Sequence, residues 1–80
     1  MKMTRDEIIK QGLKLSELRS QGLVYRLLDI YEMNSDVLAY ASTIGGLRGF
    51  IDERIADTDG ECYLITQKWD NENNSYKSIN

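Results

Sequence analysis

The first twenty residues carry the pattern of an amphipathic helix. Thr4 and Glu7 form a capping box, a pair whose side chains accept hydrogen bonds from each other's backbone at a helix start. Beyond them the apolar residues recur at imperfect helical spacing; these are Ile8, Ile9, Leu13, Leu15 and Leu18. Gly12 interrupts this stripe, and Gly22 follows it, where glycine is typical of a helix end. The pattern predicts one helix over residues 4–20, with Gly12 as the position where it is most easily broken.

Residues 23–41 fit two kinds of secondary structure. In residues 23–31 the apolar positions match helical spacing, but they also suit a strand that is buried on both faces. Tyrosine, valine and isoleucine favour the strand. A polar turn over residues 32–35 and an apolar run over residues 36–41 complete a β-hairpin, which we favour over a pair of helices.

A second helix is predicted after the hairpin. Ser42 or Thr43 is placed to cap it. An apolar stripe at helical spacing follows, made of Ile44, Leu47, Phe50, Ile51 and Ile55. The turn signal at residues 58–60 ends the helix near Asp57. Ile51 lies at the centre of the stripe, so we expect it to be a core residue.

The C-terminal residues predict two strands. Residues 62–69 have the clearest strand pattern in the chain, residues 70–74 are a polar turn, and residues 75–79 fit a short edge strand. The order α-β-β-α-β-β predicts a single α+β domain over residues 1–80. It is a small antiparallel sheet with one helix packed across a face and an N-terminal helix. The alternative is a helical bundle with a C-terminal β-hairpin.

The composition is that of a small globular domain. Of the 80 residues, 41% are hydrophobic and 29% are charged, which differs from the composition of disordered chains. Cys62 is the one cysteine, which excludes a disulfide within the chain and favours a reducing compartment. No apolar run has the length of a membrane span, and the charged N-terminus does not resemble a secretory signal. We therefore expect a cytoplasmic protein with no membrane association.

Charge is distributed unevenly along the chain. The net charge is −3, but residues 1–28 hold six basic and three acidic residues, whereas residues 29–61 hold eight acidic and two basic residues. This arrangement indicates an electrostatically polarised surface, which speeds association with a partner of opposite charge.

The residue inventory argues against catalysis and metal binding. Without histidine the chain lacks the commonest general base and metal ligand, and Cys62 alone forms neither a thiol–histidine pair nor a zinc site. Residues 55–66 fail as a calcium loop, because Ile55 and Thr66 occupy its first and last ligand positions. Residues 45–49 lack the lysine of a phosphate-binding loop, and we expect their glycines to allow close packing of helix on sheet. We predict a protein that is not an enzyme and that binds no cofactor and no metal.

The candidate binding residues form two sets. Acidic and aromatic side chains are the candidates for contact with a protein partner, since tyrosine and tryptophan are enriched at interfaces; they are Asp52, Glu53, Asp57, Asp59, Trp69 and Tyr76. The bases of the N-terminal helix are the candidates for contact with nucleic-acid phosphates; they are Lys10, Lys14 and Arg19, with Lys10 and Lys14 four residues apart on one helix. No aromatic residue lies among these bases, and the whole chain is acidic, so we expect no direct nucleic-acid binding.

Residues 23–55 are similar in plan to a group of known small proteins. The segment LVYRLLDIYEMNSDVLAYASTIGGLRGFIDERI resembles the strand–turn–strand–helix unit of many accessory proteins of phages and mobile elements, several anti-CRISPR proteins among them. The resemblance implies an inhibitor that occupies a surface of a host protein or nucleoprotein complex, and it assigns no binding residue. We favour a non-catalytic protein-binding module that docks through the acidic helix face and the adjacent sheet edge. The alternatives are a small nucleic-acid-associated regulator that uses the basic N-terminal helix and a structural subunit that forms homo-oligomers through an edge strand.

Overall fold

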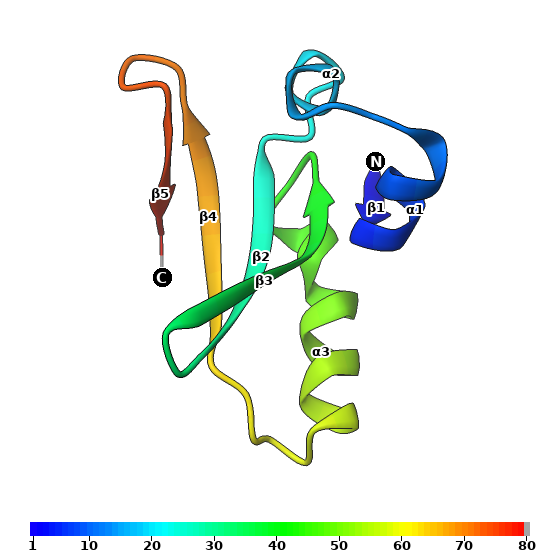
Figure 1. The fold of residues 1–80 in the computed structure, drawn as a ribbon, viewed down its shortest axis with the longest axis vertical. Helices are drawn as coiled ribbons and strands as arrows, with labels where there is room; N and C mark the ends of the chain where they lie inside the picture. The colour runs from blue at the N-terminus through cyan, green and yellow to red at the C-terminus, as the bar shows by residue number, and fades with distance from the viewer. Residues whose placement is uncertain (80) are drawn as a thin grey trace.

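The computed structural model describes residues 1–79. They form a five-stranded antiparallel sheet with helices on both faces (Figure 1). The elements are β1 (Lys2–Thr4), α1 (Arg5–Gln11), α2 (Leu15–Ser20), β2 (Tyr25–Tyr31), β3 (Asn34–Ala41), the 3₁₀ turn η1 (Gly45–Leu47), α3 (Arg48–Asp57), β4 (Leu64–Asp70) and β5 (Ser75–Ser78). Helix makes up 33% and strand 37%, so the predicted α+β class is confirmed and the alternative helical bundle does not form. None of the helices described in residues 1–79 is long and apolar enough to span a membrane.

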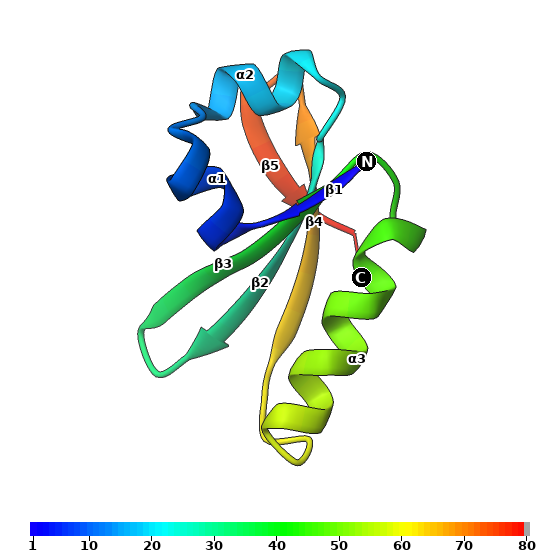
Figure 2. The same cartoon turned by 90° about the vertical axis from the view of Figure 1, so that its right-hand side faces the viewer.

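The sheet separates two hydrophobic clusters. Its strands are ordered β1-β3-β2-β4-β5, and Figure 2 shows α1 and α2 on the opposite side of the twisted sheet from α3. The cluster under α1 and α2 contains Met3, Ile8, Leu18, Leu23 and Tyr40. The cluster under η1 and α3 contains Leu27, Ala39, Ala41 and Leu47. Each face of the sheet is therefore covered over part of its length, and the alternation of residues along β3 serves both clusters.

The β2–β3 hairpin forms where the sequence favoured it. Residues 32–33 join the two strands, and the pairing of β3 with β2 skips Leu38. This bulge lets Leu38 and Ala39 both pack toward α3, whereas Val37 packs toward α1. Because one residue is skipped, each side chain of residues 34–37 lies on the opposite side of the sheet from the one it would have without the bulge.

The N-terminal helix is broken at Gly12. α1 begins at the predicted capping box and ends at Gly12, which adopts φ 67°. The N–H of Leu13 donates to the carbonyl of Ile8, which is the closing hydrogen bond of a Schellman motif. Lys10 therefore lies in α1 and Lys14 just before α2, so the single helix predicted to carry both on one face does not form. The short strand β1, which precedes α1, was not predicted at all.

The helix after the hairpin is anchored by Leu47 rather than by Ile51. Leu47 is fully buried at the end of η1, and Ile51 is half-buried. Ile44 and Ile55, at the two ends of the predicted stripe, are 53% and 44% exposed. Ile51, which was expected to be a core residue, packs against the cluster that contains Leu47 but is only half-buried, because the stripe that meets the sheet is narrower than its spacing indicates.

One of the three glycines near this helix allows the expected close approach to the sheet. A Cβ at Gly46 would lie 3.0 Å from Cβ of Ala41 on β3, which is too close for a side chain without movement. Gly45 and Gly49 have open space at the same position. Close packing therefore explains Gly46 alone.

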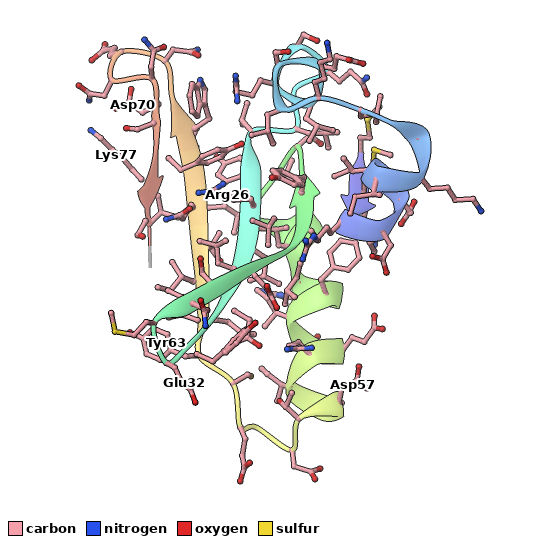
Figure 3. The ribbon with its side chains drawn as sticks, viewed as in Figure 1. Arg26, Glu32, Asp57, Tyr63, Asp70 and Lys77 are labelled. Atoms are coloured by element: carbon pink, nitrogen blue, oxygen red, sulfur yellow. The ribbon has the colours of Figure 1, made fainter. Side chains whose placement is uncertain are left out.

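Asp70 organises the turn between β4 and β5. Its carboxylate lies 2.9 Å from Nζ of Lys77, and Figure 3 labels both residues. It also accepts hydrogen bonds from Nδ2 of Asn73 at 2.7 Å and from the N–H of Glu72 at 2.9 Å. Lys77 first, and then the other two donors, lower the pKa of Asp70 from 3.8 to about 2.

We expect Asp70 to contribute to acid unfolding. Because its folded-state pKa is depressed, the ionised carboxylate stabilises the fold above about pH 4, and this stabilisation is lost as the pH falls toward 2. Asp70→Asn should therefore flatten the fall of the melting temperature across this pH range, measured by thermal unfolding. Glu72→Gln, in the same turn, serves as the control and should keep the wild-type slope. An Asp70→Asn variant with the wild-type slope would contradict this role.

Candidate protein-binding surface

Three of the predicted acids lie on α3 with their side chains in solvent. Asp52, Glu53 and Asp57 are all exposed. Asp57 is the last residue of α3, where the negative end of the helix dipole disfavours a carboxylate. The carboxylate of Asp57 therefore destabilises the end of its own helix, and such locally unfavourable residues are typical of positions that serve a function.

Arg54, the base between these acids, is turned toward the sheet. Its Nη2 lies 2.8 Å, and its Nε 2.9 Å, from Oδ2 of Asp29 on β2, whose side chain is 6% exposed. The N–H of Tyr63 donates to the other carboxylate oxygen at 3.3 Å. The hydrogen bond to Asp29 raises the pKa of Arg54 above its ordinary value. The charge of Arg54 thus compensates a buried acid, and the exposed acids of α3 are left without it.

A pocket of about 290 Å³ gathers carboxylates from three parts of the chain, between the start of α1, β3 and α3. Its four acids are Asp6, Asp36, Glu53 and Asp57, and its apolar lining is Val37, Leu38 and Phe50. We call this site the acidic pocket. Solvent-accessible carboxylates are suited to bind lysine and arginine. Within residues 1–79, the acidic side chains do not lie close enough together to form a metal site.

The bases of the acidic pocket neutralise it incompletely. They are Arg5 and Arg54, and Arg54 is already paired with Asp29. Arg5 lies 3.9 Å from Asp36, and both side chains are largely in solvent, so this contact is weak. Asp6 and Asp36 were not predicted as binding residues, because their distance along the chain from α3 conceals that they share a pocket with it.

One exposed aromatic side chain of the hairpin contacts the acidic pocket, and further exposed side chains lie nearby along the chain. The hydroxyl of Tyr31 donates to Oδ2 of Asp36 at 3.0 Å, and this carboxylate raises the pKa of Tyr31. Tyr31 is 46% exposed, and Met33 in the hairpin turn is 98% exposed. Tyr63, which is 65% exposed, accepts at its carbonyl from the N–H of Ile30 on β2. Tyrosine is enriched at interfaces, so Tyr31 extends the candidate surface beyond the acids.

Trp69 and Tyr76 lie on the other face of the sheet, toward α2. Their rings meet edge to face at 5.1 Å. The guanidinium of Arg19 lies 4.0 Å from the Trp69 ring, and that of Arg26, labelled in Figure 3, lies 3.6 Å from the Tyr76 ring. Nε1 of Trp69 donates to Oδ1 of Asn71 at 2.7 Å. The structure therefore does not bring these two aromatic residues together with the acids of α3, and their contacts are those of packed side chains.

The remaining predicted residues lie outside the acidic pocket. Asp59 is exposed in the turn after α3 and adopts φ 53°. Lys10 and Lys14 are exposed on either side of the break between α1 and α2, and Arg19 is half-buried against Trp69. The three bases do not share one helix face, so the geometry provides no continuous basic strip for a phosphate backbone.

Comparison with known proteins adds no family to this geometry. No protein-family model, curated protein or solved structure matches the chain. The similarity in plan to phage accessory proteins therefore stays a prediction, and the function is argued from the acidic pocket and its surroundings.

Proposed function

We propose that this protein is a non-catalytic protein-binding module whose contact surface is the acidic pocket together with Asp52. The observation that carries the proposal is the convergence of four carboxylates from α1, β3 and α3 on one open pocket, while Arg54 is paired with the buried Asp29. Such a surface attracts a basic patch and raises the rate of encounter with it. The exposed ring of Tyr31, whose hydroxyl donates to Asp36, supplies contact area next to the charges.

The same surface supports an inhibitory mode of action. A domain that presents carboxylates on an open pocket occupies the basic surface to which it binds, and competes with any other ligand of that surface. We propose that the partner is a host protein or nucleoprotein complex and that occupation of its basic surface is the inhibitory step. Inhibition then requires no catalytic group on this chain.

Charge reversal on α3 tests the proposed surface. The surface variant carries Asp52→Lys, Glu53→Lys and Asp57→Lys; the matched control carries Glu17→Lys, Glu61→Lys and Glu72→Lys, three exposed acids that do not line the acidic pocket. Both variants change the net charge equally, so a general charge effect would appear in both. Exposed charges contribute little to stability, and a lysine at position 57 suits the helix dipole, so we expect the melting temperature to stay near the wild-type value.

The measurement is affinity capture from cells of the native source, quantified by mass spectrometry. The wild-type protein and the matched control should enrich the same partner, and the surface variant should lose it. A folded surface variant that enriches this partner as well as the wild type would show that the acids of α3 are not the contact surface.

A further inference from the structure

The first half of β3 is an open edge of the sheet. β1 pairs only with Ala39–Ala41 among the described residues, and β3 lies next to β1 in the sheet order. Within residues 1–79, no strand is paired with the outer side of residues 34–37. An unpaired strand edge is a template for a further strand.

The backbone of Ser35 faces outward from this edge. The N–H of Ile30 donates to the carbonyl of Tyr63, so the backbone of Ile30 faces β4 rather than β3. Ser35 is the residue opposite Ile30, and in an antiparallel ladder the partner of such a residue directs its own N–H and C=O away. The same alternation places the backbone groups of Val37, opposite Leu28, on the outer side. Two residues thus offer their donors and acceptors to a strand from outside.

Pockets lie on both sides of this edge. The acidic pocket is on the side of α3, and a second pocket of about 260 Å³ lies on the side of α1, lined by Ile8 and Tyr40 among others. Both pockets include Arg5, Asp36 and Val37. Since side chains of a strand point alternately to its two faces, every second side chain of an added strand would enter each pocket.

We propose that an extended basic segment of the partner adds as a strand along Ser35–Val37. Its lysine or arginine side chains bind Asp6, Glu53 and Asp57 in the acidic pocket, and the alternate, aliphatic side chains contact Ile8 and Tyr40. This inference rests on the proposed function and names the form of its partner. Charge decides the occupant: a second copy of this chain, with a net charge of −3 and the same acids on its own edge, would be repelled. Main-chain hydrogen bonds supply affinity in this mode, and the two pockets supply specificity.

The test uses a probe of defined composition. An acetylated and amidated hexapeptide of alternating lysine and valine is titrated into the ¹⁵N-labelled protein, and alternating glutamate and valine is the control peptide. We expect the basic peptide to shift the amide signals of Ser35 and Val37 and to slow their hydrogen exchange, and the acidic peptide to do neither. Shifts confined to α3, or no binding by the basic peptide, would overturn the inference.

A substitution at Ser35 makes the test specific to the backbone. Ser35→Pro removes the outward N–H and leaves the pairing with β2, as proline is accommodated on edge strands. Ser35→Ala keeps the N–H and serves as the control for this substitution. We expect Ser35→Pro to lower the affinity for the basic peptide about tenfold, as the loss of one well-formed hydrogen bond implies. Ser35→Ala should bind the peptide with the wild-type affinity. If Ser35→Pro does not fold, the hydrogen exchange of the wild-type amides decides the matter.

The failure of this inference is distinguishable from failure of the proposed function. If Ser35→Pro captures the cellular partner as well as the wild type does, and the surface variant loses it, the proposal of an added strand is wrong. The proposal that the acidic surface binds the partner is then still supported. A surface variant that retains the partner overturns both. Self-association of the free wild-type protein with protected Ser35 and Val37 amides overturns the choice of occupant.

Discussion

Replacement of Leu47 by alanine should destabilise the fold by about 2–5 kcal/mol, the cost of deleting a fully buried leucine side chain. Leu47 ends the η1 turn and packs with Leu27, Ala39 and Ala41, and α3 itself contains no buried residue. The position of the acidic helix therefore depends on this one side chain more than on any apolar residue within the helix. For a domain of this size the total stability is on the order of 4–12 kcal/mol, so the variant is expected to be partly unfolded at elevated temperature.

Denaturation with urea, followed by circular dichroism, measures this effect. Ile55→Ala on α3 is the control, and because its side chain is 44% exposed it should cost less than about 1 kcal/mol. Ile51→Ala, at a half-buried position, should fall between the two. Equal effects of Leu47→Ala and Ile55→Ala would show that α3 is not held to the sheet in this way.

Arg54→Ala should destabilise the fold more than Ile55→Ala does, because it leaves the buried Asp29 carboxylate without its cation. The Arg54 side chain is 36% exposed, so screening by water keeps the effect below that of breaking a fully buried ion pair. The N–H of Tyr63, which donates to Asp29 at 3.3 Å, would still be in place in this variant. The pair also fixes the rotation of α3 over β2, and so the direction of its exposed acids.

A double-mutant cycle separates the ion pair from the packing of the arginine side chain. With Asp29→Asn in the background, Arg54→Ala removes no charge partner, so its cost should be smaller than in the wild type. An equal cost of Arg54→Ala in both backgrounds would mean that the charge of Asp29 plays no part.

The order of the large elements could be predicted from local sequence patterns. The capping box at Thr4, the turn at residues 58–60 and the apolar runs of β3 and β4 are each encoded by neighbouring residues. β1 escaped prediction because three residues are too few for a period, and its pairing with β3 is a tertiary contact. The end of the helix at Asp57 was predicted correctly, but a 3₁₀ turn comes first, so α3 begins at Arg48 rather than after Ser42 or Thr43. Of the predicted apolar stripe, Leu47, Phe50 and Ile51 pack on the sheet, whereas its two ends are exposed.

The candidate surface depends on contacts between distant residues, and these set the limit of prediction from sequence. Glu53 and Asp57 were identified from their charge, but Asp6 joins them through the folding of α1 over β3. Nothing in the local sequence pairs Arg54 with Asp29, twenty-five residues away. Trp69 was predicted as a binding residue because tryptophan is enriched at interfaces, yet the guanidinium of Arg19 covers its ring.

The association rate of the captured partner tests the central claim most directly. The wild-type protein, the surface variant and the matched control are compared at low and at high ionic strength by stopped-flow mixing with that partner. Electrostatic steering predicts that the surface variant associates at least about tenfold more slowly than the wild type at low salt, that the matched control stays close to the wild type, and that salt reduces the difference. Equal association rates for a folded surface variant and the wild type at low salt would contradict the assignment of the acidic surface as the binding site.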